Sequence, residues 1–200
     1  MKKKLSGSTT KTKKKIIGID YSLNSPAVCI ADESFNFDKC NFFFLTSKKK
    51  HMGIFGKNIS GIEHKEYKDP IERFYNLSQW VIDIIDEYVG LYNLEVYIEG
   101  YSFGSKGQAV FQIAENCGIL KYRLMDKRID YETVVPTQVK KFASGKGNAD
   151  KQLMYDSFCK EHKNELMKDF DMGKLNNPVT DIVDSFYIAK YGFDKNKKSN

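Results

Sequence analysis

The chain has 200 residues, of which 41% are hydrophobic and 14% aromatic, and its four cysteines are scattered without a Cys-x-x-Cys pair. This composition supplies enough apolar material for one domain and excludes wholesale disorder. The mean hydropathy is −0.51 and no run approaches 18 apolar residues, so no membrane-spanning helix is expected. No apolar segment of a signal peptide follows the basic first residues. The cysteine pattern argues against a disulfide framework or a zinc site. We therefore expect a globular domain in the cytoplasm.

The net charge of +6 is concentrated at the two ends of the chain. Residues 1–15 contribute +7 and residues 190–200 contribute +3, so residues 16–189 carry −4. Basic ends of this kind either bind polyanions such as DNA or only keep a disordered segment in solution, and the composition leaves both open. We expect a disordered tail at 1–15, one domain at 16–192 and a second basic tail at 193–200.

The first third of the chain predicts strands. Three short apolar runs, at 16–20, 27–31 and 41–46, are separated by turn-forming residues and predict an antiparallel meander. Residues 47–70 have no clear period and contain several glycines, so we expect a long, partly mobile loop there.

The remainder of the chain alternates between predicted helices and strands. Apolar residues at helical spacing predict helices at 71–89, 107–127, 149–163 and 180–191. Alternating patterns predict strands at 94–99 and 131–135. This order of elements predicts an α/β domain with a five-stranded mixed sheet and helices on both faces.

Four carboxylates occupy the ends of predicted elements. Asp20 closes the first strand and Glu99 closes the fourth, and each runs into an open loop, where α/β sheets place their sites. Asp181 and Asp184 lie three residues apart at the start of the last helix and share one side of it. Taken singly, Asp20 is explained as a turn residue and Asp181 as helix N-terminal charge. Together, the four predict an oxygen-only site for two Mg²⁺ ions, with Mn²⁺ as an expected substitute.

The same residues lie in four segments that resemble the RuvC-type Holliday junction resolvases, which have the RNase H-like fold. The segments are IIGIDYSLNSPAVCI, VYIEGYSFGSKGQAVFQIAENCGIL, VVPTQVKKFASGKGNADKQLM and TDIVDSFYIAKYG. The resemblance covers about residues 16–190. It implies that Asp20, Glu99, Asp181 and Asp184 are the metal ligands and that the active form is a homodimer. The dimer face would be the helix around 108–122.

The resemblance also implies DNA contacts. Lys146 and Lys151 flank a glycine turn and correspond to lysines that contact the scissile and neighbouring phosphates, with Lys151 the catalytic candidate. We interpret Lys140 and Lys141 as a basic face for DNA without a catalytic role.

An aromatic wedge is expected in the loop after Glu99. Tyr101 and Phe103 follow Glu99 where the family places an aromatic side chain against bases at the crossover. An ungapped match puts Ser102 at that position, so the aromatic is displaced by one residue. The three histidines show no pairing with a nucleophile, and we expect them at the surface.

The resulting hypothesis is a Mg²⁺-dependent crossover junction endodeoxyribonuclease that resolves four-way DNA junctions by paired phosphodiester hydrolysis. The main alternative is a noncatalytic or broader-specificity protein of the same fold that binds or processes branched DNA. A nucleotide-binding protein of the actin or sugar-kinase type is disfavoured, because the chain is short and lacks a second phosphate loop. Larger residues in the last motif, such as Ile182 and Phe186, indicate a viral or phage relative. No membrane partner is expected, and a branch-migration motor stays an open possibility.

Overall fold

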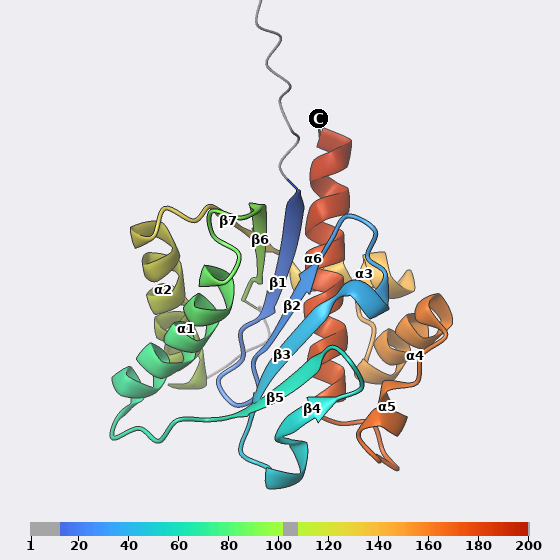
Figure 1. The fold of residues 1–200 in the computed structure, drawn as a ribbon, viewed down its shortest axis with the longest axis horizontal. Helices are drawn as coiled ribbons and strands as arrows, with labels where there is room; N and C mark the ends of the chain where they lie inside the picture. Colours follow the sequence, from blue (N-terminus) through green and yellow to red (C-terminus); the bar gives the residue numbers. More distant parts are fainter. Residues whose placement is uncertain (1–12, 102–107, 200) are drawn as a thin grey trace, which may run out of the picture.

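The computed structural model describes residues 13–101 and 108–199 (Figure 1). One sheet has the strand order β4-β5-β3-β2-β1-β6-β7. The strands are β1 (Lys14–Asp20), β2 (Ala27–Ala31), β3 (Asn41–Thr46), β4 (Gly53–Phe55), β5 (Ile59–Glu63), β6 (Asn93–Glu99) and β7 (Tyr131–Val134). The helices are α1 (Pro70–Asp86), α2 (Gln108–Asp126), α3 (Pro136–Ser144), α4 (Lys151–His162), α5 (Leu166–Asp169) and α6 (Val179–Ser199), with 3-10 turns at Phe37–Lys39 and Lys49–His51. No helix in this described part is long and apolar enough to cross a membrane.

The predicted meander and the mixed character of the sheet are confirmed. Strand β2 runs antiparallel to both β1 and β3, whereas β6 runs parallel to β1. In the parallel pair Ile19 lies opposite Ile98. Asp20 and Glu99, one residue further along, therefore stand side by side at the same edge of the sheet.

The prediction of five strands is wrong, because the expected loop at 47–70 contains β4 and β5. Strand β4 is antiparallel to β5, and β5 is parallel to β3. Both are short, and Ile54 and Ile62 are exposed, so neither strand shows the alternating pattern of a half-buried strand. Gly61 is typical of a loop in the sequence. In the structure it lies in β5, where a side chain would overlap the Phe44 ring and the carbonyl oxygen of His51.

Helices cover both faces of the sheet, as expected. Helices α1 and α2 pack over one face, on side chains such as Ile17, Ile19 and Ile98. Helices α3, α4 and α6 pack over the other face, on side chains such as Ile16 and Tyr97 (Figure 1). The two sets differ because successive side chains of a strand point to opposite faces.

Helix α6 crosses the sheet at very short range, and this places its first turn over the edge that carries Asp20. A side chain at Gly18 would overlap the carbonyl oxygen of Ser185 and the backbone of Ala189. The helix continues to Ser199, beyond its predicted end at residue 191, because Phe193 is buried and packs on Phe35.

Two further predictions differ from the structure. The first strand was predicted at 16–20, after a disordered tail at 1–15, whereas β1 begins at Lys14. The Nζ of Lys14 lies 2.5 Å from Oε1 of Glu95. The expectation that all three histidines are at the surface fails for His51, which is 2% exposed and packs against Phe170. Its segment was expected to be a loop and instead covers the core.

Candidate active site

The sheet edge formed by β1 and β6 carries two of the four predicted carboxylates. Asp20 ends β1 and Glu99 ends β6, and both line one cleft of about 530 Å³. Asp20 is buried, with 8% of its surface exposed, and Glu99 is half-buried. Each carboxylate comes directly after an apolar strand, so the strand fixes its position at the cleft.

Helix α6 supplies the other two carboxylates. Asp181 lies in its first turn with 4% of its surface exposed, and Asp184 follows one turn later. Both line the same cleft as Asp20 and Glu99. The structure therefore brings together all four carboxylates that the sequence selected, from three elements far apart in the chain.

A hydrogen-bond network ties the turn after β1 to the start of α6. The Nδ2 of Asn177 donates to the Oγ of Ser25, and the hydroxyl of Thr180 donates to Oδ1 of Asn177 at 2.7 Å. The same hydroxyl lies 3.3 Å from Oδ1 of Asp181. This network holds Asp181 in place relative to the strand that carries Asp20.

Lys151 joins this network from α4. Asp150 caps α4 by accepting the backbone N–H of Leu153 at 2.8 Å, which puts Lys151 at the first helical position. Its Nζ donates to Asn177 and Thr180, both at 3.2 Å, and lies 4.0 Å from Oδ1 of Asp181. The structure thus places Lys151 at the edge of the carboxylate cleft, and its contact with a DNA phosphate stays a prediction.

Burial raises the pKa of every carboxyl group in the cleft, and repulsion from neighbouring carboxylates adds to the rise at Asp20, Glu99 and Asp181. The pKa of Asp20 lies well above its usual range, because of burial first and then because of the three neighbouring carboxylates. Burial also raises the pKa of Glu99 to about 7, with Asp184 adding to the effect. The pKa of Asp181 rises to about 7, again mainly through burial. These carboxylates are fully ionised near neutral pH only if a cation compensates them.

Two lysines oppose this rise. Burial raises the pKa of Asp184 to about 6, while Lys151 and then Lys140 lower it. Lys140 also lowers the pKa of Glu99. Lys140 lies on α3, a helix that the sequence analysis did not predict. Its positive charge therefore lowers the pKa of two carboxyl groups in the cleft. Lys141, its neighbour, is exposed.

The donor set of the cleft fits a hard divalent cation. All four acidic side chains offer oxygen, which Mg²⁺ and Mn²⁺ prefer, and Oδ2 of Asp181 is buried without a hydrogen-bond partner in the described residues. Across 13–101 and 108–199, no three His, Cys, Asp or Glu side chains are already grouped as in a formed metal site. A cation bound between the four carboxylates would offset the repulsion between their charges.

The remaining predicted residues lie at different distances from the cleft. Tyr101 lines it, is 48% exposed, and has the Nζ of Lys121 5.1 Å from its ring centre. Lys146 lies in the turn between α3 and α4 with an exposed side chain. Phe103 lies outside the described residues. Sequence reasoning missed Asn177 as the link between Ser25 and Asp181, because that contact spans 152 residues and leaves no local pattern.

Comparison with known proteins gives one family. A family model described as "Crossover junction endodeoxyribonuclease RuvC" matches residues 54–157, a stretch that contains Glu99, Lys146 and Lys151. No curated protein matches the chain.

Three solved structures share the fold. The Thermus thermophilus RuvC structure aligns with a TM-score of 0.55 and 13% identity over 92% of this chain and 96% of that one. T. thermophilus RuvC in complex with a Holliday junction substrate aligns with a TM-score of 0.60 and 12% identity over the same shares. The yeast mitochondrial Holliday junction resolvase Ydc2 aligns with a TM-score of 0.55 and 14% identity, covering 93% of this chain and 80% of its own.

Proposed function

The chain belongs to the RuvC family, and from this premise we propose that it is a divalent-metal-dependent endonuclease that resolves four-way DNA junctions. The convergence of Asp20, Glu99, Asp181 and Asp184 on one cleft supports this proposal most directly. The family and the shared fold support a Holliday junction resolvase. The carboxylate cleft adds the hydrolytic chemistry, since it offers the oxygen ligands of a two-metal nuclease.

In the proposed mechanism the protein positions a phosphodiester at the sheet edge. If the four carboxylates hold two Mg²⁺ ions, the chemistry supplied there would be activation of a water for in-line attack and stabilisation of the departing oxygen. Asp20 and Glu99 would hold this centre from the rigid strand ends, and Asp181 and Asp184 would close it from α6. The exposed ammonium group of Lys151 can contact a phosphate oxygen, because its long side chain is 61% exposed beside Asp181.

A homodimer would place two such clefts on one junction, so that two symmetric strands are nicked. An exposed apolar stripe on α2 supports this part of the proposal: Phe111 is 70% exposed, Tyr122 62% and Met125 63%. Gly118 lies on the same side with open space above it. Apolar side chains at helical spacing with small residues between them suit the face of a twofold dimer.

The proposal is tested by incubating the protein and Mg²⁺ with labelled four-way junctions, Y-forks and linear duplex. We expect paired, symmetric nicks confined to the four-way junction. Cleavage of all branched substrates alike would favour the broader-specificity alternative. Binding without cleavage would favour the noncatalytic one.

Substitutions of the carboxylates test the metal assignment. Asp20→Asn, Glu99→Gln and Asp184→Asn should each abolish cleavage and leave junction binding nearly intact, since other contacts supply the affinity. Asp156→Asn is the matched control, because Asp156 is an exposed carboxylate on α4 outside the cleft. Retention of more than about a tenth of the wild-type rate in Asp20→Asn or Glu99→Gln would overturn the two-metal assignment, since loss of a metal costs several kcal/mol of barrier.

A further inference from the structure

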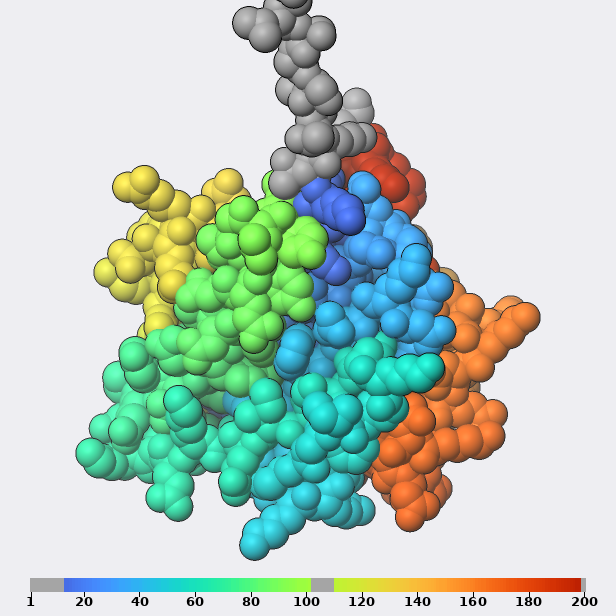
Figure 2. All heavy atoms as spheres, viewed as in Figure 1, coloured from blue at the N-terminus to red at the C-terminus, as the bar shows by residue number. Residues whose placement is uncertain are grey.

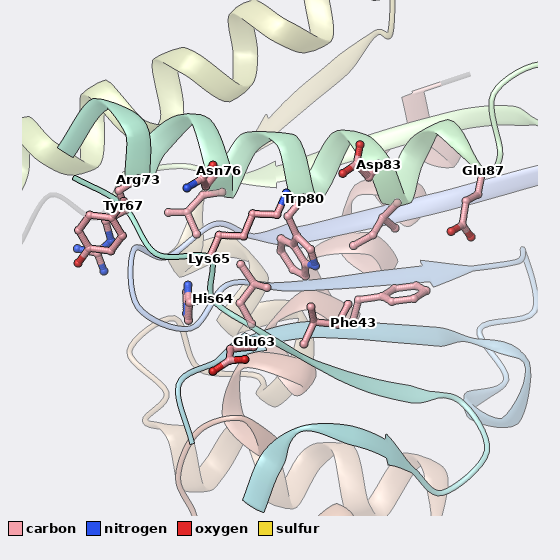
Figure 3. Close-up of a pocket in the computed structure, with 14 residues that line it drawn as sticks. Phe43, Glu63, His64, Lys65, Tyr67, Arg73, Asn76, Trp80, Asp83 and Glu87 are labelled. Atoms are coloured by element: carbon pink, nitrogen blue, oxygen red, sulfur yellow. The ribbon is translucent and has the colours of Figure 1, made fainter. Parts of the chain in front are cut away.

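A second hollow lies between α1 and the strands β3 and β5, away from the carboxylates (Figure 3). On this face β5 and the chain that leads from it into α1 lie at the molecular surface (Figure 2). The hollow has a volume of about 310 Å³, and we call it the α1 groove. Its floor is apolar and consists of Phe43, Leu45, Ile62, Leu77, Trp80 and Ile84. Its helical wall extends from Arg73 to Glu87, which is about 21 Å along a helix.

Two buried N–H donors in the wall of the α1 groove have no acceptor among the described residues. They are Nε1 of Trp80, whose side chain extends from α1 into the groove, and Nε of Arg73. Trp80 is 9% exposed, so solvent is largely kept from its ring. A buried donor without a partner costs about 1–3 kcal/mol. Neither nitrogen is reachable from the groove as it stands, so an acceptor in the groove would relieve this cost only after a side chain of the wall shifts.

The guanidinium of Arg73 is held so that this donor stays in place. Its Nη2 donates to the carbonyl oxygen of Leu23 at 2.9 Å and to Oδ1 of Asn24 at 2.7 Å. Nε2 of His64, from the opposite wall, lies 2.9 Å from the carbonyl oxygen of Asn24. Leu23 and Asn24 also line the carboxylate cleft. One end of the α1 groove thus lies directly behind the turn that borders the cleft.

The two ends of the α1 groove differ in charge. Arg73 and Lys65 lie at one end, with Glu63 on the strand side, and Asp83 and Glu87 lie at the other end (Figure 3). The rim has more acidic than basic groups, so it does not attract a DNA backbone. A groove that is long, narrow and apolar, with opposite charges at its two ends, suits an extended peptide whose alternate side chains enter the floor and whose end residues pair with those charges.

We propose that the α1 groove binds an extended segment of a partner protein. The segment carries aliphatic side chains in its centre, a basic residue at the Asp83–Glu87 end and an acidic residue at the Arg73–Lys65 end. Binding there places the partner beside the turn that borders the cleft, and it does not depend on the nuclease chemistry proposed above.

Trp80 is the sole tryptophan of the chain, so its fluorescence reports the α1 groove directly. The probes are acetylated, amidated hexapeptides with the core Leu-Ser-Val-Leu, because six extended residues span about 20 Å. One probe carries Lys and Glu at its two ends, a second carries Lys at both, and a third carries Glu at both. We expect a saturable change in Trp80 emission, with the mixed-charge probe binding at least about threefold more tightly than either other probe.

Variants on the rim provide matched controls. Ile62→Asp should remove binding, whereas Ile54→Asp should not, because Ile54 is exposed on the neighbouring strand and does not line the groove. The double variant Asp83→Lys with Glu87→Lys alters only exposed positions, so it retains the fold, and it should reverse the preference toward the Glu–Glu probe. Junction cleavage should be unchanged in Ile62→Asp, which separates this proposal from the proposed nuclease function.

Four outcomes would overturn the proposal. They are the absence of any saturable change, equal affinity for all three probes, an unchanged preference in the double variant, and a shift of Trp80 emission without peptide. If that last shift appears on deletion of residues 1–12, the chain's own N-terminal segment occupies the groove. If it appears on raising the protein concentration, a second copy does.

Discussion

The Nζ of Lys151 lies 4.0 Å from Oδ1 of Asp181, at a helix N-terminus where a cation is unfavourable. The positive end of the α4 dipole opposes the lysine, and the cleft carboxylates favour it. Lys151 lowers the pKa of all four carboxyl groups. The position is therefore set by the cleft and not by the helix.

Removal of this charge should slow cleavage and shift its pH dependence. In Lys151→Ala the cleft carboxyl groups lose a cation that lowers their pKa, so they ionise at higher pH. We expect the acid limb of the pH–rate profile, measured at limiting Mg²⁺, to move to higher pH. We also expect the rate to fall by about 10²-fold, the usual cost of losing one electrostatic contact to the reacting group. Lys146→Ala is the control for the acid limb only, because Lys146 is itself a predicted phosphate contact and its loss should slow cleavage without moving that limb. An unmoved acid limb in Lys151→Ala would contradict the assignment.

The same carboxyl groups predict how stability depends on pH. The pKa values of Asp181 and Asp184 in the folded chain, about 7 and about 6, exceed the ordinary value of 3.8. The folded state therefore binds protons more tightly, and this contribution is complete below about pH 4 and lost as pH rises toward 7. Without divalent metal, the free energy of unfolding of the wild type should fall over this range relative to that of Asp181→Asn.

Thermal melts in EDTA between pH 4 and pH 8 measure this difference. Comparison with the variant is needed because burial lowers the pKa of His51, which makes stability rise with pH in both proteins alike. A difference of 1 kcal/mol corresponds to about 2–4 °C in Tm for a chain of this size. Addition of Mg²⁺ at pH 7.5 should raise the Tm of the wild type more than that of Asp181→Asn. Parallel pH profiles for the two proteins would contradict the predicted pKa values.

The sequence was informative where a local pattern carries the structure. Asp20 and Glu99 end apolar strands, and the spacing of Asp181 and Asp184 places both on one side of a helix. The four carboxylates of the cleft could therefore be predicted from the sequence. Strand β5 could not be predicted, because its partner β3 and the close fit at Gly61 are tertiary features. Long-range polar contacts likewise leave no local pattern. The effect of Lys140 on the cleft follows only from the packing of α3.

The N-terminal lysines should contribute affinity for DNA without structural preference. Deleting residues 1–12 removes four lysines but leaves Lys14, which belongs to β1 and pairs with Glu95. Binding to junction and duplex should weaken alike, and the salt dependence should flatten by about 0.9 in log–log slope for each lysine that contacts a phosphate. Titrations at several salt concentrations measure both. Loss of the preference for junctions in the truncated chain would show that recognition does not reside in the folded domain.

The loop after Glu99 is the predicted source of junction selectivity. A junction differs from duplex in the unstacked bases at its crossover, and an aromatic ring can stack on them. Tyr101 is half exposed at the edge of the carboxylate cleft, with Lys121 over its ring, and Phe103 lies two residues further on. Phe103→Ala should lower cleavage of intact junctions, since base–aromatic stacking contributes about 1–3 kcal/mol.

Pre-nicked junctions provide the comparison that isolates the wedge, because they open without help. We expect Phe103→Ala to reduce cleavage of intact junctions much more than that of pre-nicked ones, and Tyr101→Ala to have the smaller effect. If Tyr101→Ala reproduces the whole effect while Phe103→Ala is silent, the wedge is Tyr101, whose position beside Gly100 already borders the cleft. If neither substitution changes the ratio of intact to pre-nicked cleavage, this loop does not open the junction. The one-residue displacement of the aromatic from the family pattern would then mark a real loss of the wedge.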